Sequence, residues 1–175
     1  LICQDLIRIY GRGICSPRII MKLDLHKAYD SVECSFIDEI LVELGFPNRI
    51  RKLIMQCISS PTYNFTINVE SFGYVIGKRG LRQGDPLSPL LFTLCLEYLS
   101  RLLEIIQCLP GFRFHPKCKH LRFNHLCFAD DLILFSHGGI SSVKLLCFAF
   151  ETFSKVSGLK MNKSKSKFYC HGLSP

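Results

Sequence analysis

Two adjacent aspartates, Asp130 and Asp131, stand between two strongly apolar runs, and this pattern restricts the folds open to the chain. The run before them begins at Leu126, and the run after them, Leu-Ile-Leu-Phe, ends at Phe135. Each run has the length of a β-strand and is too short for a helix. Ionised carboxylates in such surroundings cost free energy unless a cation or hydrogen-bond donors compensate them. The sequence therefore predicts two strands with a pair of acids between them that need a partner.

A third acid follows another apolar segment. Residues 19–23, Ile-Ile-Met-Lys-Leu, lead directly into Asp24. Three acids at the ends of two strands would converge on one point, and a magnesium ion is commonly held by one or two carboxylates plus substrate phosphates. A pair of such ions serves nucleotidyl transfer. Two alternatives stay open at this point: the Asp-Asp pair as turn chemistry, and Asp24 as the N-cap of a turn through Leu25 to Tyr29.

The remaining elements follow from hydrophobic periodicity and from Gly and Pro positions. A capping box at Ser35 to Asp38 predicts the start of a helix that ends at Gly45. The long helix from 88 to 107 is predicted to be buried, because its first turns are apolar on every face. The predicted strands are 18–25, 63–69, 72–76, two runs within 121–135 and one in the tail, and the other helices are 47–61 and 141–156. This order predicts an α+β fold whose helices cover one face of a mostly antiparallel sheet.

Composition narrows the class of protein. The net charge of +8 favours a polyanionic partner such as nucleic acid. The absence of about 18 consecutive apolar residues argues against a transmembrane helix. The cysteines within apolar runs, and the N-terminus without a signal-peptide pattern, predict a reduced, intracellular protein. Because the chain starts at Leu1 and contains no linker, residues 1–175 are expected to be one domain cut from a longer polypeptide.

Four motifs in order resemble those of reverse transcriptases from non-LTR (LINE-type) retrotransposons, with wording closest to plant elements. They cover nearly the whole chain, and four together are far more specific than one. The first is Met21-Lys-Leu-Asp-Leu-His-Lys-Ala-Tyr-Asp-Ser-Val32, and the second is Gly77-Lys-Arg-Gly-Leu-Arg-Gln-Gly-Asp-Pro-Leu-Ser-Pro-Leu-Leu-Phe92. The third is Phe128-Ala-Asp-Asp131, and the fourth is Ser157-Gly-Leu-Lys-Met-Asn-Lys163.

The resemblance implies a polymerase palm-like antiparallel sheet backed by helices, with part of the fingers and without thumb or endonuclease. It implies an RNA-directed DNA polymerase that adds dNTPs to a primer 3′-hydroxyl with two Mg²⁺ ions, Mn²⁺ being a substitute. The partners would be an RNA template, a DNA primer and dNTPs. Asp24 and Asp130 would hold both ions, Asp131 would support them, and the Leu25 carbonyl would be a further ligand.

The resemblance also implies nucleotide-binding residues. Tyr29 matches the position whose ring lies under the sugar and excludes a 2′-hydroxyl, although without the motif an ordinary core aromatic is the simpler interpretation. Gln83 and Gly84 match the loop that lines the incoming nucleotide and the template base. Arg82 and Lys78 would face phosphate, with a solvated loop as the alternative.

Two lysines of the fourth motif are further candidates. Lys160 and Lys163 fall where related polymerases recruit a proton donor for pyrophosphate. Lys160 is taken as the donor candidate and Lys163 as a nucleotide contact, although the motif does not distinguish the two. A plain basic surface against a duplex is the alternative for both.

Other patterns compete with these interpretations. Cys118, His120, His125 and Cys127 would supply four zinc ligands, but their spacing departs from the usual pattern of zinc sites, and ordinary strand residues are favoured. The usual Trp two residues after Val32 is replaced by Cys34, and in the first hairpin turn the usual Asn-Gly is replaced by Asn-Val. Both departures are compatible with a decaying element copy.

Two rival functions remain at this stage. One is a catalytically inactive retroelement remnant that only binds nucleic acid. The other is a hydrolase that uses Asp24 and Asp130 as an acid/base pair, which would require carboxyls about 5–9 Å apart. The hydrolase leaves the loop around Gln83 without a role.

Overall fold

The structure is a computed structural model that describes residues 16–77, 79–128 and 130–172. Its described residues form two compact units. The first contains 16–25, 97–128, 130–153 and 161–172, and the second contains 26–77, 79–96 and 154–160. None of the described helices is long and apolar enough to cross a bilayer.

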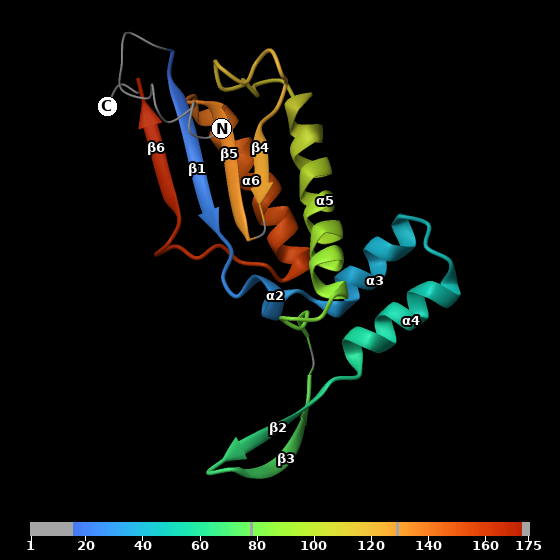
Figure 1. Cartoon of the computed structure of the whole chain (residues 1–175). Coiled ribbons are helices and arrows are strands. Elements are labelled where there is room, and N and C mark those ends of the chain that lie inside the picture. The colour runs from blue at the N-terminus through green and yellow to red at the C-terminus, as the bar shows by residue number, and fades with distance from the viewer. Residues whose placement is uncertain (1–15, 78, 129, 173–175) are drawn as a thin grey trace. The chain divides into compact units, whose positions relative to one another are not determined.

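The first unit is built on a four-stranded antiparallel sheet (Figure 1). Its strand order is β4-β5-β1-β6. The sheet places the two segments that carry aspartates, far apart in sequence, in adjacent strands. The strands are β1 (Arg18–Asp24), β4 (His125–Phe128), β5 (Asp131–His137) and β6 (Lys167–His171).

Helices cover one face of this sheet, as the sequence predicted (Figure 1). They are residues 97–107 of α5 (Leu87–Gln107) and 140–153 of α6 (Ile140–Ser157). Met21 and Leu23 pair with Leu134 and Leu132, and all four side chains are buried. Since alternate residues of a strand point to opposite faces, these four form the helix-facing layer.

The opposite face is covered at one end only. There Ile20 and Phe135, which face each other across the β1–β5 ladder, pack with Cys118 and Phe123 from the segment between α5 and β4. At the other end of the same face, the side chains become partly exposed. We call this second end the open end of the sheet, and it is where β1 finishes and β5 begins.

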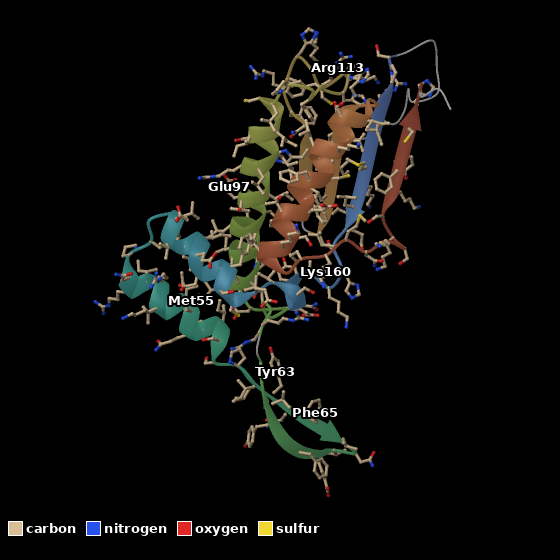
Figure 2. The ribbon with its side chains drawn as sticks, turned by 180° about the vertical axis from the view of Figure 1, so that it is seen from behind. Met55, Tyr63, Phe65, Glu97, Arg113 and Lys160 are labelled. Carbon is tan, nitrogen blue, oxygen red and sulfur yellow. The ribbon has the colours of Figure 1, made fainter. Side chains whose placement is uncertain are left out.

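The second unit contains a helical part and a hairpin. The two strands of the hairpin extend away from α3 and α4 of the same unit (Figure 1), and every residue of both strands is exposed. Figure 2 shows Tyr63 near the base of the hairpin and Phe65 farther along it. The elements are α2 (Ala28–Ser31), α3 (Cys34–Glu43), α4 (Asn48–Ser59), β2 (Thr62–Ile67) and β3 (Glu70–Ile76).

The β2–β3 turn has an unusual backbone. Asn68 and Val69 both adopt positive φ, at 49° and 73°. A β-branched residue rarely adopts this region, and Gly is the residue best suited to the second position of such a turn. The replacement noted in the sequence therefore places strain at this turn.

Several sequence-based boundaries were wrong. The capping box is absent, because α3 begins at Cys34 and its N-cap, Glu33, makes no side-chain cap bond. Asp24 does not cap a helix, since the N-cap of α2 is Lys27. The start of α5 is not buried on every side, as Leu90 is 65% exposed. Residues 121–124 form a turn and loop before β4 begins at His125. The interpretation of residues 1–15 concerns a segment outside the described residues.

Candidate active site

Two of the three candidate acids face each other across the open end of the sheet. Asp24, the last residue of β1, is the ladder partner of Asp131, the first residue of β5. Directly opposed residues in an antiparallel pair project from the same face, with Cβ atoms about 4.5–5.5 Å apart. Two like charges in this arrangement destabilise the pair unless a cation lies beside them.

Lys22 supplies a cation at this position. Its Nζ lies 3.0 Å from Oδ2 of Asp131, and both side chains are 41% exposed. Lys22 and Asp24 are two residues apart on β1, so they share a face. The hydrogen bond to Asp131, together with the charges of Asp131 and Asp24, raises the pKa of Lys22 against a smaller opposing effect of burial. The lysine therefore stays protonated beside the two acids.

Asp130 lies in the turn that precedes β5 and is exposed. Within the described ranges, no three side chains of the His, Cys, Asp or Glu type are gathered closely enough to hold a metal ion by themselves. The structure therefore brings Asp24 and Asp131 together, with Asp130 next in sequence to Asp131, and does not form a closed three-carboxylate cage.

The backbone of Asp24 is held by the segment before β6. Its N–H donates to Oγ of Ser166 at 3.1 Å, and its carbonyl accepts from the N–H of Asn162 at 2.8 Å. The Ser166 hydroxyl in turn donates to the Asn162 carbonyl at 2.8 Å. Leu25, which is buried, forms an isolated antiparallel bridge with Met161. These contacts fix the position from which the Asp24 side chain projects.

The donor set at the open end fits a hard divalent cation. Its free carboxylate oxygens belong to the ligand class of Mg²⁺, which keeps several waters and needs only one or two protein carboxylates. A partly exposed face leaves room for those waters and for substrate phosphates. A ligand role for the Leu25 carbonyl remains a prediction from the resemblance.

A cavity of about 490 Å³ lies within the second unit. Two predicted nucleotide-binding residues, Arg82 and Gln83, line it. The remaining residues that line the cavity are Asp30, Tyr63, Arg79, Gly80 and Leu81. This cavity combines guanidinium groups, an amide, a carboxylate and an aromatic ring, which are side chains suited to a polar aromatic ligand.

Glycine is required at one wall of this cavity. A Cβ on Gly80 would lie 2.7 Å from the carbonyl oxygen of Asp30, closer than real contacts allow. The Gly80 N–H donates to Val32 at 2.9 Å, and the Leu81 N–H donates to the Tyr29 carbonyl at 2.7 Å. These bonds hold the loop against the segment that carries Tyr29.

The other predicted nucleotide residues occupy different surroundings. Tyr29 is partly buried and stacks on Phe92, with ring centroids 4.8 Å apart. Gly84 has a φ of 90° and open space where a side chain would be, so it needs Gly for its backbone. Arg82 donates to the Cys57 carbonyl at 3.3 Å, in the last turn of α4, a bond that also gives it a structural role.

The basic candidates differ in their placement. Lys160 and Lys163 are both exposed, and Lys160 (labelled in Figure 2) belongs to the second unit while Lys163 belongs to the first. The Lys160 carbonyl accepts a hydrogen bond from His26 at 2.8 Å. Lys78 lies outside the described residues.

The four cysteines and histidines weighed as zinc ligands have separate surroundings. Cys118 is buried with its sulfur 3.8 Å from the His115 ring, whereas His120 is exposed. The His125 ring contacts Asn124 and Ser100, at 2.8 and 2.9 Å. Burial raises the pKa of the Cys127 thiol to about 11, which disfavours the thiolate that zinc requires.

Sequence reasoning missed several residues near these sites. A period of two places Lys22 on the same face as Asp24, but its contact with Asp131 depends on the pairing of β1 with β5. Ser166 carried no signal, since its bond to Asp24 joins residues far apart in the chain. Asp30 and Arg79 lie within the quoted motifs, and Tyr63 lies within a predicted strand. Nothing in the sequence indicated that these three residues line a common cavity.

A sequence model described as reverse transcriptase (RNA-dependent DNA polymerase) matches residues 12–174. The chain belongs to the reverse transcriptase family. Its members are nucleotidyltransferases, and the match spans all four motifs found in the sequence.

Relatives place the chain among retroelements. It is 31% identical to the Pol polyprotein of the R2 retrotransposable element of Popillia japonica over 83% of the chain and 23% of that protein. The Drosophila melanogaster R2DM Pol polyprotein is also 31% identical, over 83% of the chain and 13% of its own length. An uncharacterized mitochondrial protein of Arabidopsis thaliana is 53% identical over 38% of the chain and 56% of that protein. The chain therefore spans about half or less of the length of these relatives.

Solved structures support the fold. Telomerase from Candida albicans, determined with a fragment of telomeric RNA, has a TM-score of 0.68 at 14% identity, covering 98% of the chain and 29% of that protein. Telomerase from Candida tropicalis gives 0.65 at 14% identity, over 93% and 27%. At this identity the likeness concerns the fold, and it confirms the palm-like antiparallel sheet backed by helices.

Proposed function

We propose that this chain is the palm and part of the fingers of an RNA-directed DNA polymerase that adds deoxynucleotides to a primer on an RNA template. The observation that carries the proposal is the pairing of Asp24 with Asp131 at the open end of the sheet, in a chain of this family. Two carboxylates that face each other on a partly exposed surface are able to bind a divalent cation together with its waters.

The first unit would hold the divalent ions. Asp24 and the exposed Asp130 would be the ligands, with Asp131 in support. When bound, two Mg²⁺ ions would activate the primer 3′-hydroxyl and neutralise charge on the triphosphate. Ser166 and Asn162 keep the Asp24 backbone fixed, so the carboxylate needs little reorganisation to bind an ion.

The second unit would bind the nucleotide. Gln83 and the guanidinium groups that line the 490 Å³ cavity would contact the base and the phosphates. Tyr29, backed by Phe92, would meet a 2′-hydroxyl and so favour deoxynucleotides. Lys160 and Lys163 stay candidates for phosphate contact or for proton donation to pyrophosphate.

Primer extension tests the proposal. The assay uses an RNA template, a DNA primer, dNTPs and Mg²⁺, with Asp24→Asn and Asp130→Asn beside the native chain. Each variant is expected to lose at least about 100-fold in rate, because each removes a proposed metal ligand. The matched control is Asp38→Asn, which removes a carboxylate from an ion pair with Arg51 on the surface of α3 and α4.

The same assay separates the alternatives. Equal rates in native and Asp24→Asn proteins would contradict the mechanism. No extension by the native chain, with salt-sensitive RNA binding retained, would identify an inactive remnant that only binds nucleic acid. Tyr29→Ala is expected to raise ribonucleotide use about tenfold or more, and an unchanged ratio would leave Tyr29 as a core aromatic.

A further inference from the structure

The three acids of the open end have different surroundings. Asp131 is held at 3.0 Å by Lys22, whereas neither Asp24 nor Asp130 takes part in an ion pair of the described residues. Asp24 instead has its backbone held by Asn162 and Ser166. A carboxylate already neutralised by a lysine is a poorer ligand for a second cation than one left to solvent.

The placement of Lys22 follows from the strand itself. It precedes Asp24 by two residues, so both project from the same face of β1. Asp131 faces Asp24 directly, and Ile133 faces Lys22, so the lysine crosses the ladder diagonally to reach the acid. The long side chain of lysine spans such diagonal distances of about 7–8 Å between Cα atoms.

We propose that Lys22 is a positioning residue that keeps Asp131 out of metal coordination and so leaves Asp24 and Asp130 as the ligands of the divalent ions. This inference rests on the proposed function and adds to it the side chain that sets Asp131 apart from the two ligands. Lys22 also offsets the repulsion between the facing carboxylates before any cation binds.

Mn²⁺ binding, followed by the electron paramagnetic resonance signal of the free ion, tests this directly in the 175-residue chain. In the native background, Asp131→Asn is expected to change the Mn²⁺ affinity less than about threefold, because its carboxylate belongs to Lys22. In a Lys22→Met background the freed Asp131 becomes a ligand. The Lys22→Met variant is therefore expected to bind Mn²⁺ about tenfold more tightly than the native chain. The double variant Lys22→Met/Asp131→Asn is expected to lose that gain.

Lys167 supplies the matched control. It faces Lys22 across the β1–β6 ladder, is exposed and takes part in no ion pair among the described residues. Lys167→Met removes the same charge from the same face without touching Asp131, and should change the affinity less than twofold. Lys22→Arg retains the charge and should restore native behaviour, which guards against misfolding of Lys22→Met.

The outcomes separate the two proposals. If Asp131→Asn lowers Mn²⁺ affinity equally with and without Lys22, or if Lys22→Met matches Lys167→Met, the positioning role is wrong while the proposed function stands. If the native chain fails to bind Mn²⁺, both are wrong. The positioning role is supported if Asp131→Asn lowers the Mn²⁺ affinity only when Lys22 is replaced by Met, and if Lys22→Arg behaves as the native chain does.

Discussion

The two hairpins of this molecule have similar local patterns and opposite environments. β4 and β5 lie in a four-stranded sheet, where Leu132 and Leu134 are buried. β2 and β3 form a two-stranded sheet whose residues are all exposed. A two-stranded hairpin is marginally stable on its own in water, so burial and not strand pattern sets the stability of each. Of the candidate acids, Asp130 and Asp131 belong to the β4–β5 hairpin, and Asp24 ends β1, the strand paired with β5.

The largest expected difference in unfolding free energy is between a truncation in the buried core of the sheet and a truncation on the exposed hairpin. Leu134→Ala, at a side chain 1% exposed, is expected to cost about 3 kcal/mol of unfolding free energy, because it leaves a cavity under the helices. Phe65→Ala, at a side chain 57% exposed, should cost less than about 1 kcal/mol. Urea unfolding of both variants measures this. Equal losses would mean that the β2–β3 hairpin is as well packed as the sheet.

Acid is expected to destabilise the sheet unit next. Burial first, then the charges of Arg18 and Lys117, lowers the pKa of His115 from 6.5 to about 4. The unfolded chain therefore takes up this proton first, so stability is present above pH 6.5 and is lost as pH falls towards 4. The loss amounts to about 3 kcal/mol at most.

Urea unfolding between pH 7.5 and 4.5 checks this, with His115→Asn as the control. Asn keeps an acceptor for the Lys117 N–H, which now donates to Nδ1 of His115 at 3.3 Å, and does not titrate. Its pH dependence should be shallower than that of the native chain. Hydrogen exchange should show acid exposing the β5 amides before any change at β3. If the unfolding free energy of His115→Asn depends on pH as steeply as that of the native chain, His115 is not the source of the acid destabilisation.

The smallest expected effect concerns the β2–β3 turn. Val69 is 96% exposed with a φ of 73°, so it contributes strain and no packing. Val69→Gly should stabilise the hairpin by about 1 kcal/mol, measured as slower exchange of the β2–β3 amides. Val75→Gly, within β3, should have the opposite effect. Faster exchange in Val69→Gly would contradict the strain argument.

Much of the fold was predictable because its signals are local. Apolar runs of strand length predicted β1, β4 and β5, and the alternation in residues 63–69 predicted the β2–β3 hairpin. Gly158, with a φ of 77°, follows the end of α6 as expected. The start of α3 was wrong because a long-range bond intervenes: the Glu33 N–H donates to the Ser157 carbonyl at 3.0 Å and fixes an extended residue before the helix. Local patterns do not contain such bonds.

In the candidate site too, local motifs were predictable from the sequence and long-range contacts were not. Asp24, Asp130 and Asp131 were identified from motifs, and the ladder brings two of them opposite each other. Their partners Lys22 and Ser166 were not identified. The first requires knowing that β1 pairs with β5, and the second requires a contact across most of the chain.

The position of β6 has a consequence for how the protein is made. Among the described strands, β6 comes last in the sequence, and its pairing with the outer edge of β1 places β1 inside the sheet. Until that segment leaves the ribosome, the nascent chain presents β1 as an unpaired edge, which invites pairing with neighbouring chains. Asp24 acquires its backbone partners in the same final step, so a product truncated before Asn162 would be both prone to aggregate and unable to fix its first carboxylate.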